Sequence, residues 1–384
     1  MSTFNTQILS TLTTRFPTSD ALFAWLQTDE GGNLAIRTNS NGLSLVYSIK
    51  DAPVPRTKTS NFALAHVREF RSVVWDTHTN RPICVGPRSG RPLAEMGEVP
   101  CDVMDEFVDG VMINLFYYGG RWQLATHTVL GAANRFYGQR AFGTLFWETF
   151  TSMGLVVDDL NKSATYSWVL QHPEERVVSG TLGGIPRLWL IAHTDCELNG
   201  KFAILRPTQY TEATSLAAIE ERVRAIGAKF GPNVKGLILK TNEDSFTIRT
   251  PEYLAAHALR GNQPKHAFTW LDHWSSGKLG AYMRIFPEEQ AECTAILEQF
   301  KVCTQEFHDW YLKVYCHRGE APIPLALAPQ KYRKLLWEAR QANTGSYFGN
   351  LRTFMNKQDT ARKVWLIHYE ARYGVPVPVF VPSA

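Results

Sequence analysis

The spacing of hydrophobic and polar positions changes along the chain at about residue 265. Between residues 70 and 250, short apolar runs bounded by turn residues predict mostly β-structure. The runs 110–118 and 121–126 are joined by Gly119-Gly120, and two strand-like runs with a glycine pair between them predict a β-hairpin. Further strands are predicted at 71–76, 187–193 and 235–240.

Helical spacing interrupts this region once and then takes over. In residues 211–230, apolar side chains recur every three or four positions, which predicts a helix between strands. After about residue 265 the pattern is helical to Tyr373, with Pro287 placed as a first-turn proline and one break at 322–324. Strands first and helices later predict an α+β fold with a helical appendage.

Composition excludes several classes of protein. With 384 residues, 44% of them hydrophobic and 20% charged, the chain can bury the cores of two domains and is not expected to be disordered. No apolar run reaches about 18 residues, so no membrane-spanning helix is expected, and the N-terminal sequence lacks the pattern of a secretory signal. The six cysteines include no C-x-x-C pair and are expected to be reduced thiols in the cytosol or nucleus.

Basic residues gather near the C-terminus. Residues 331–372 hold nine Lys and Arg against three Asp and Glu, a difference of +6, whereas the whole chain carries +4. Aromatic residues lie between them, and this mixture suits a phosphate backbone with unpaired bases. The alternative is a pair of amphipathic helices with a solvated basic face. The candidate nucleic-acid-binding residues are Lys331, Arg333, Lys334, Arg352, Lys357, Arg362 and Lys363.

A series of short motifs between residues 69 and 253 follows a recognisable order. The segments are 69–76 (EFRSVVWD), 81–98 (RPICVGPRSGRPLAEMGE), Phe107-Val108-Asp109-Gly110, 117–131 (YYGGRWQLATHTVLG), 168–178 (WVLQHPEERVV), 234–240 (VKGLILK) and 246–253 (FTIRTPEY). In this order they resemble the motifs of the phage-type RNA ligase 1 family of covalent nucleotidyltransferases. The resemblance covers about half the chain.

The resemblance implies a fold and a domain organisation. It implies an ATP-grasp-like RNA/DNA ligase adenylation domain with antiparallel sheets, followed by a C-terminal helical domain. Residues 1–68 would be the N-terminal part of the ligase-like domain, 69–262 its nucleotidyltransferase-like core, and 263–384 the helical domain.

The family's chemistry requires residues that this chain lacks. In the family the lysine of K-x-D-G attacks the α-phosphate of ATP, but Phe107 stands at that position and has no lone pair. Glutamates of two later strands correspond to Val169 and Lys235, and the first lysine of K-x-K corresponds to Thr247. A lysine in place of a carboxylate reverses the charge where a divalent metal is expected to bind. The resemblance therefore implies a ligase fold with degenerate catalytic motifs and no catalytic residue.

At other positions of the family's nucleotide site, this chain has residues of the same or a similar chemical type. They are Arg71, Asp109, Gly110, Trp168, Lys240 and Arg249, with Trp168 where the family stacks adenine. The resemblance implies a weakened nucleotide cleft built on these residues. The alternative is that Asp109-Gly110 is only a turn and Trp168 only part of the core. A metal at His193, Asp195 and Glu197, which would share one face of a strand, is less expected than an exposed strand end, so no metal is assigned.

These observations lead to two hypotheses. The favoured one is a catalytically inactive ligase-like protein, of viral or phage origin, that binds RNA, another nucleic acid or a protein. It would act in the cytoplasm or nucleus of a host or in a virus particle, without a membrane and without a cofactor. The alternative is an active ATP-dependent RNA ligase or nucleotidyltransferase that uses ATP, Mg²⁺ and a non-standard nucleophile.

Overall fold

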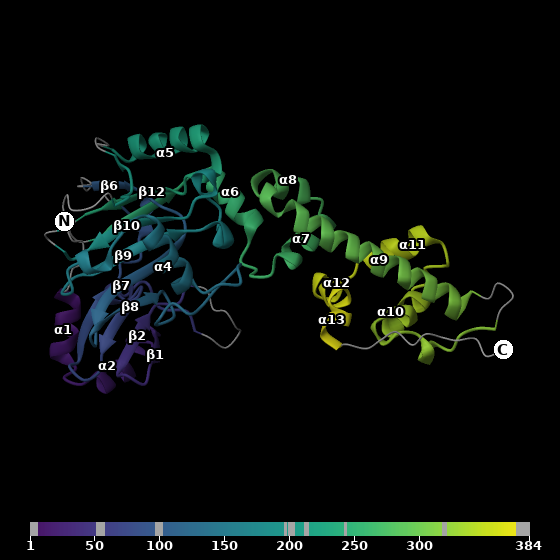
Figure 1. Cartoon of the computed structure of the whole chain (residues 1–384), viewed down its shortest axis with the longest axis horizontal. Helices are drawn as coiled ribbons and strands as arrows, with labels where there is room; N and C mark the ends of the chain where they lie inside the picture. Colours follow the sequence, from purple (N-terminus) through teal and green to yellow (C-terminus); the bar gives the residue numbers. More distant parts are fainter. Residues whose placement is uncertain are drawn as a thin grey trace. The chain divides into compact units, whose positions relative to one another are not determined.

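The computed structural model describes residues 7–50, 58–96, 103–195, 198, 204–210, 215–241, 244–316 and 321–373. The chain divides into two compact units, residues 1–258 and 259–384. The fold is α+β, with antiparallel sheets in the first unit and helices in the second, as the spacing pattern predicts (Figure 1). Residues 97 and 98 of the segment 81–98, Cys101, Cys196 and Glu197 lie outside the described residues. The described cysteines are free thiols.

Three sheets make up the first unit. In spatial order, the first sheet is β1 (Ala35–Thr38), β2 (Leu43–Tyr47), β3 (Val73–Asp76) and β4 (Arg81–Val85). The second is β10 (Arg187–His193), β9 (Thr165–Gln171), β7 (Val111–Tyr118) and β8 (Arg121–Thr126). The third is β11 (Gln209–Tyr210), β6 (Val103–Glu106), β12 (Gly236–Lys240), β13 (Ser245–Arg249) and β5 (Arg91–Pro92). All described pairs are antiparallel except β13 with β5.

The predicted hairpin is confirmed. Strands β7 and β8 pair with Leu115 opposite Leu124 and Tyr118 opposite Arg121. The turn is Gly119-Gly120, with φ of 61° and 80°. Two successive positive φ angles give the turn a backbone twist that matches the twist of the paired strands, and glycine adopts them without steric cost.

The first unit also contains helices. They are α1 (Gln7–Arg15), α2 (Ser19–Leu26), α3 (Ala65–Glu69), α4 (Phe142–Ser152), α5 (Leu216–Phe230) and α6 (Pro251–Arg260), which ends in the second unit. The helix predicted over 211–230 is α5, and it begins after Ser215, whose side chain accepts a hydrogen bond from the amide of Ala218. This N-cap satisfies a backbone donor that has no partner inside the helix.

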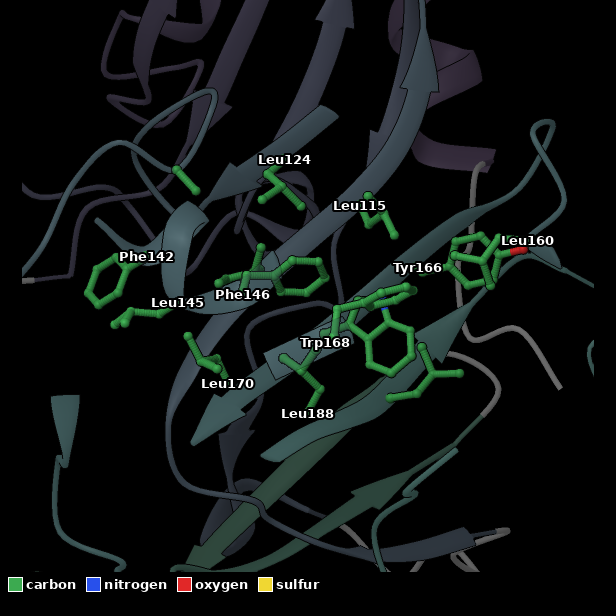
Figure 2. Close-up of a cluster of buried hydrophobic side chains, with 14 of the residues drawn as sticks. Leu115, Leu124, Phe142, Leu145, Phe146, Leu160, Tyr166, Trp168, Leu170 and Leu188 are labelled. Carbon is green, nitrogen blue, oxygen red and sulfur yellow. The ribbon is translucent and has the colours of Figure 1, made fainter. Parts of the chain in front are cut away.

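The apolar faces of the three sheets pack against helices or against one another. Helix α4 buries Phe150 and Phe146, the latter labelled in Figure 2, against the second sheet, and α5 buries Ile219 and Val223 against the third. Another cluster packs Leu45 of β2 and Val74 of β3 against Phe116 and Ala125 of the second sheet. The first and second sheets therefore share a core.

The second unit is helical. Its helices are α7 (His266–Ser275), α8 (Leu279–Ile285), α9 (Gln290–Tyr315), α10 (Gln330–Gln341), α11 (Phe348–Asn356), α12 (Thr360–Ile367) and α13 (Tyr369–Tyr373). The long helix α9 (Figure 1) contributes Phe300, Phe307 and Tyr311 to a core shared with α7, α10, α11 and α12. Pro287 begins a short 3₁₀ turn immediately before α9. Among the described helices, none has the length and apolar character needed to span a membrane.

Candidate functional site

Several of the positions matched to the ligase motifs meet around a small cavity in the first unit. Its lining includes Arg71 before β3, Phe107 and Gly110 between β6 and β7, Val169 on β9, Lys235 before β12 and Lys240 at the end of β12. The cavity holds about 70 Å³. Sites for small ligands and cofactors usually hold about 300–1,000 Å³, so a nucleotide does not fit here without movement of the walls.

Two glycines let the backbones around the cavity approach each other. The φ of Gly110 is 141°, and a Cβ atom there would lie 2.4 Å from the carbonyl oxygen of Leu170. The φ of Gly236 is 148°, and a Cβ atom there would lie 1.9 Å from the carbonyl oxygen of Ile248. The amide of Phe107 donates to the carbonyl of Gly236 at 2.8 Å. Both glycines of the family's motifs are thus required by the backbone, whether or not the pocket is catalytic.

Asp109 is the most heavily bonded group beside the cavity. Its carboxylate is 2% exposed; Oδ2 accepts from the amides of Val178 at 3.0 Å and Ser179 at 3.1 Å. Its Oδ1 accepts from the Tyr253 hydroxyl at 2.7 Å and lies 3.3 Å from Nζ of Lys235. Burial by itself would raise the pKa of Asp109, but these four partners outweigh it and lower the pKa below its usual value. Asp109 therefore links its own loop to three other segments, at residues 178–179, 235 and 253.

Lys235 supplies an amine to the cavity. Its Nζ lies 4.3 Å from the centre of the Phe107 ring and 5.7 Å from that of Tyr253. Burial is the main reason that the pKa of Lys235 is lowered; Arg249 and Arg71 add to the shift and Asp109 opposes it. The resemblance gave Lys235 only as a position where the family has a carboxylate. Its role as the amine of the cavity was not predicted, although the sequence shows no lysine at 107 and a lysine at 235.

The other predicted positions are placed as follows. Burial lowers the pKa of Arg71. Nζ of Lys240 donates to Oδ2 of Asp105 at 2.6 Å. Arg249 is exposed and does not line the cavity, and the Thr247 hydroxyl donates to the carbonyl of Arg91 at 3.4 Å. The cations of the cavity are therefore Arg71, Lys235 and Lys240.

Trp168 does not lie on the cavity. Its side chain is fully buried against Phe146 and Phe150 of α4, with ring centroids 6.4 and 5.9 Å away (Figure 2). Successive side chains of a strand point to opposite faces, so the neighbouring Val169 lines the cavity instead. Trp168 is therefore part of the hydrophobic core and is not placed to stack a base in the cavity.

No metal site is evident in the described part of the chain. Within it, no three His, Cys, Asp or Glu side chains are grouped so that they could hold an ion. Asp195 accepts a hydrogen bond from the Tyr166 hydroxyl at 2.7 Å, and His193 lies 3.3 Å from a guanidinium nitrogen of Arg206.

The predicted nucleic-acid-binding residues have different surroundings in the second unit. Arg333, Lys334, Arg352 and Lys357 are exposed. Nζ of Lys331 lies 2.8 Å from carboxylate oxygens of both Glu306 and Glu370, and Arg362 pairs with Glu338 at 2.7 Å. Lys363 is 1% exposed and donates to the hydroxyl of Ser275 at 2.6 Å, which leaves it no face for a phosphate.

Comparisons with known proteins find similarity only among solved structures. No protein-family model matches the sequence, and no curated protein matches it. A Naegleria gruberi RNA ligase mutant with ATP and Mn is similar over 44% of this chain and 57% of its own, at 12% identity and a TM-score of 0.33. This chain therefore spans little more than half the length of that ligase. An archaeal ATP-dependent RNA ligase is similar over 96% of this chain and 99% of its own, at 10% identity and a TM-score of 0.42.

Proposed function

We propose that this chain is an RNA-ligase-like protein that binds nucleic acid and does not carry out lysine-dependent nucleotidyl transfer. The observation that supports the proposal is the state of the cavity. About 70 Å³ remain between Phe107, Lys235 and their neighbours, and the amine of Lys235 is 3.3 Å from the buried carboxylate of Asp109. A cavity filled by the protein's own side chains has no room for ATP.

The charges of the cavity also disfavour the reaction. An ammonium ion paired with a carboxylate has no lone pair with which to attack phosphorus. Val169 and Thr247 provide neither the carboxylate nor the amine that the family has at these positions. Loss of one group that stabilises a transition state costs roughly 2.7–4 kcal/mol, so several losses together remove most of the rate enhancement.

The proposed function implies which ligands the chain binds. No cofactor is expected, because the cavity is too small for a nucleotide. Asp105 and Glu106 line it, but Asp105 already accepts from Lys240, and the described residues group no three His, Cys, Asp or Glu side chains around it. RNA or another nucleic acid is the proposed partner, through basic and aromatic side chains of the second unit. Protein partners, a viral or phage origin, and a place in a host cell or a virus particle stay predictions.

A second function is favoured by one observation, the amine of Lys235 in the cavity. If the walls opened to admit ATP, a neutral Lys235 could attack the α-phosphorus. The Nζ–P bond would form, the bond from the α-phosphorus to the pyrophosphate oxygen would break, and the amine proton would pass to Asp109 or to water. The lowered pKa of Lys235 favours the neutral amine that this step needs.

One experiment separates the two functions. The full chain is incubated with ATP labelled at the α-phosphate and with Mg²⁺ or Mn²⁺, and is then run on a denaturing gel. We expect no labelled band, and we expect retention of RNA on a filter that falls as salt rises. A labelled band that disappears in Lys235→Arg, which keeps the positive charge but not the nucleophile, would establish the second function instead.

A further inference from the structure

The second unit contains a larger pocket between α10 and α12. It holds about 570 Å³, within the range of nucleotide-sized sites. Lys334 and Leu335 of α10 line one side, and Arg362 and Trp365 of α12 line another. Phe268 of α7, Arg372 of α13 and the carboxylate residue Asp359 also line the pocket.

Two aromatic side chains form the apolar part of the pocket. Phe268 and Trp365 are both half-buried, and each packs on the core of the unit while still lining the pocket. The Trp365 ring is held edge-on against Tyr369, with centroids 4.9 Å apart. Aromatic rings fixed in this way at a pocket wall provide flat surfaces on which a base can stack.

The cations of the pocket fall into two pairs. Lys331 and Arg362 already hold carboxylates at 2.7–2.8 Å, so they fix the walls. Lys334 is 77% exposed and lies 3.9 Å from its nearest carboxylate, that of Glu338. Arg372 is exposed and forms no ion pair with any residue of the described ranges. Lys334 and Arg372 are therefore the two cations that can take a phosphate.

A second stacking surface lies just outside the pocket. Trp337 is 53% exposed, although large aromatic side chains are usually covered. On helix α10 it follows Lys334 by three residues, and Arg333 and Arg340 lie four residues before it and three after it. Residues three or four apart share a helix face, so the indole is flanked by three exposed cations.

We infer that this surface binds a single-stranded polynucleotide. One base lies in the pocket against Trp365 and Phe268, its phosphates contact Lys334 and Arg372, and the next base stacks on Trp337. The inference rests on the proposed function and gives its binding site and the form of its ligand. A duplex cannot place a base in the pocket, because its bases are stacked and paired.

The test measures binding of the full chain to a fluorescent single-stranded RNA of about 12 nucleotides, a length typical of such sites. Affinity is measured across a range of salt. We expect Lys334→Ala and Arg372→Ala each to reduce the slope of log affinity against log salt by about 0.7. We expect Trp365→Leu to weaken binding roughly 5- to 150-fold, and a duplex of the same sequence to bind more weakly than the single strand. Adenosine monophosphate is added as a competitor for the labelled strand. Displacement of the strand by it would indicate that the pocket takes a free nucleotide rather than a strand.

Matched controls lie outside the pocket. Arg284 is an exposed cation on α8, and Tyr347 is an aromatic side chain that is 73% exposed. Arg284→Ala and Tyr347→Ala should leave the affinity within about twofold. Equal losses for Arg284→Ala and Lys334→Ala would overturn the inference, because they would indicate diffuse attraction to a basic surface.

Two further results keep the test decisive. Trp365→Leu could unfold the unit, so RNA carrying 5-iodouracil is also cross-linked to the unaltered chain. The cross-link is expected on peptides that contain Trp365, Phe268 or Trp337, and cross-links elsewhere would refute the site. Absence of any RNA binding would refute the proposed function itself, whereas binding that the pocket variants do not change would refute only the site.

Discussion

The ammonium nitrogen of Lys235 lies 4.3 Å from the centre of the Phe107 ring. The resemblance to the ligase motifs would place glutamate and lysine at these two positions, respectively. The Lys235 amine also lies 3.3 Å from Oδ1 of Asp109, so the two groups form an ion pair inside the protein. We propose that this pair suits the cavity to internal ion pairing rather than to holding a metal ion with ATP.

Lys235→Met should destabilise the first unit. The substitution removes one of four partners of a carboxylate that is 2% exposed. Breaking a buried ion pair typically costs about 3–5 kcal/mol, and we expect roughly 2–3 kcal/mol here because three other donors remain. The free energy of unfolding in urea measures the effect. Lys229→Met, at an exposed position of α5, is the matched control and should change it by less than about 0.5 kcal/mol.

The contribution of Asp109 to stability should depend on pH. Its pKa in the folded chain is below that of an unfolded aspartate, about 3.9. The unfolded state therefore takes up a proton first as the pH falls, and the stabilisation is complete above about pH 4 and lost below it. Asp109→Asn cannot titrate. Its deficit in unfolding free energy should be constant from pH 7 to about pH 5 and should shrink below pH 4; a deficit that stays constant to pH 3 would contradict the lowered pKa.

Gly236→Ala should be strongly destabilising without any change of charge. A Cβ atom at this position would lie 1.9 Å from the carbonyl oxygen of Ile248, and the φ of 148° is strained for alanine. We expect a loss of roughly 3 kcal/mol or more from strain and displaced backbone. Gly119→Ala is the control, because its φ is also positive but nothing lies within 4 Å. It should cost about 1 kcal/mol, and equal losses in thermal unfolding would show that close approach is unimportant.

Local patterns in the sequence predicted the local elements of the fold. The hairpin of β7 and β8, the helix α5 and the long helix α9 all follow from spacing, turn glycines and caps within about 30 residues. The pairing of β5 with β13 could not be predicted in this way, because Arg91 and Phe246 are 155 positions apart and neither short strand has a distinctive pattern. Sheet order depends on such distant contacts, which one sequence does not encode as a periodicity.

What was missed at the site has two causes. Strand β9 alternates, with Tyr166, Trp168 and Leu170 on its apolar face, so the period of two did indicate a core position for Trp168, and the motif resemblance pointed elsewhere. Lys363 looks like any other cation of the basic segment, because its partner Ser275 is 88 positions away. The motif order did bring Arg71, Gly110, Lys235 and Lys240 to one cavity, since each motif marks a strand end.

Lys363→Met should leave RNA binding unchanged. Its amine is buried beside Ser275, 5.8 Å from the Trp274 ring and 5.9 Å from the Phe300 ring, and burial lowers its pKa. A methionine fills similar space without the charge. We expect the same affinity and the same dependence on salt as the unaltered chain, measured by anisotropy with the labelled single strand. A shallower salt dependence would mean that Lys363 reaches a phosphate.

Phe107→Lys should not restore adenylylation. The substitution returns the lysine of the family's motif but adds a second ammonium beside that of Lys235, where burial already disfavours positive charge. We expect a loss of stability and no labelled band with α-labelled ATP. Phe107→Met, similar in length but neutral, should not show the charge-dependent part of that loss.

The double substitution Phe107→Lys with Lys235→Glu restores lysine and glutamate together and relieves the repulsion. Val169 and Thr247 would still lack the carboxylate and the amine that the family has at these positions. Two missing groups at roughly 2.7–4 kcal/mol each would leave the reaction at least about 10⁴-fold slower than in a site that has both. Efficient labelling of Phe107→Lys alone would therefore mean that neither position matters to this cavity and that its small volume is no barrier to ATP.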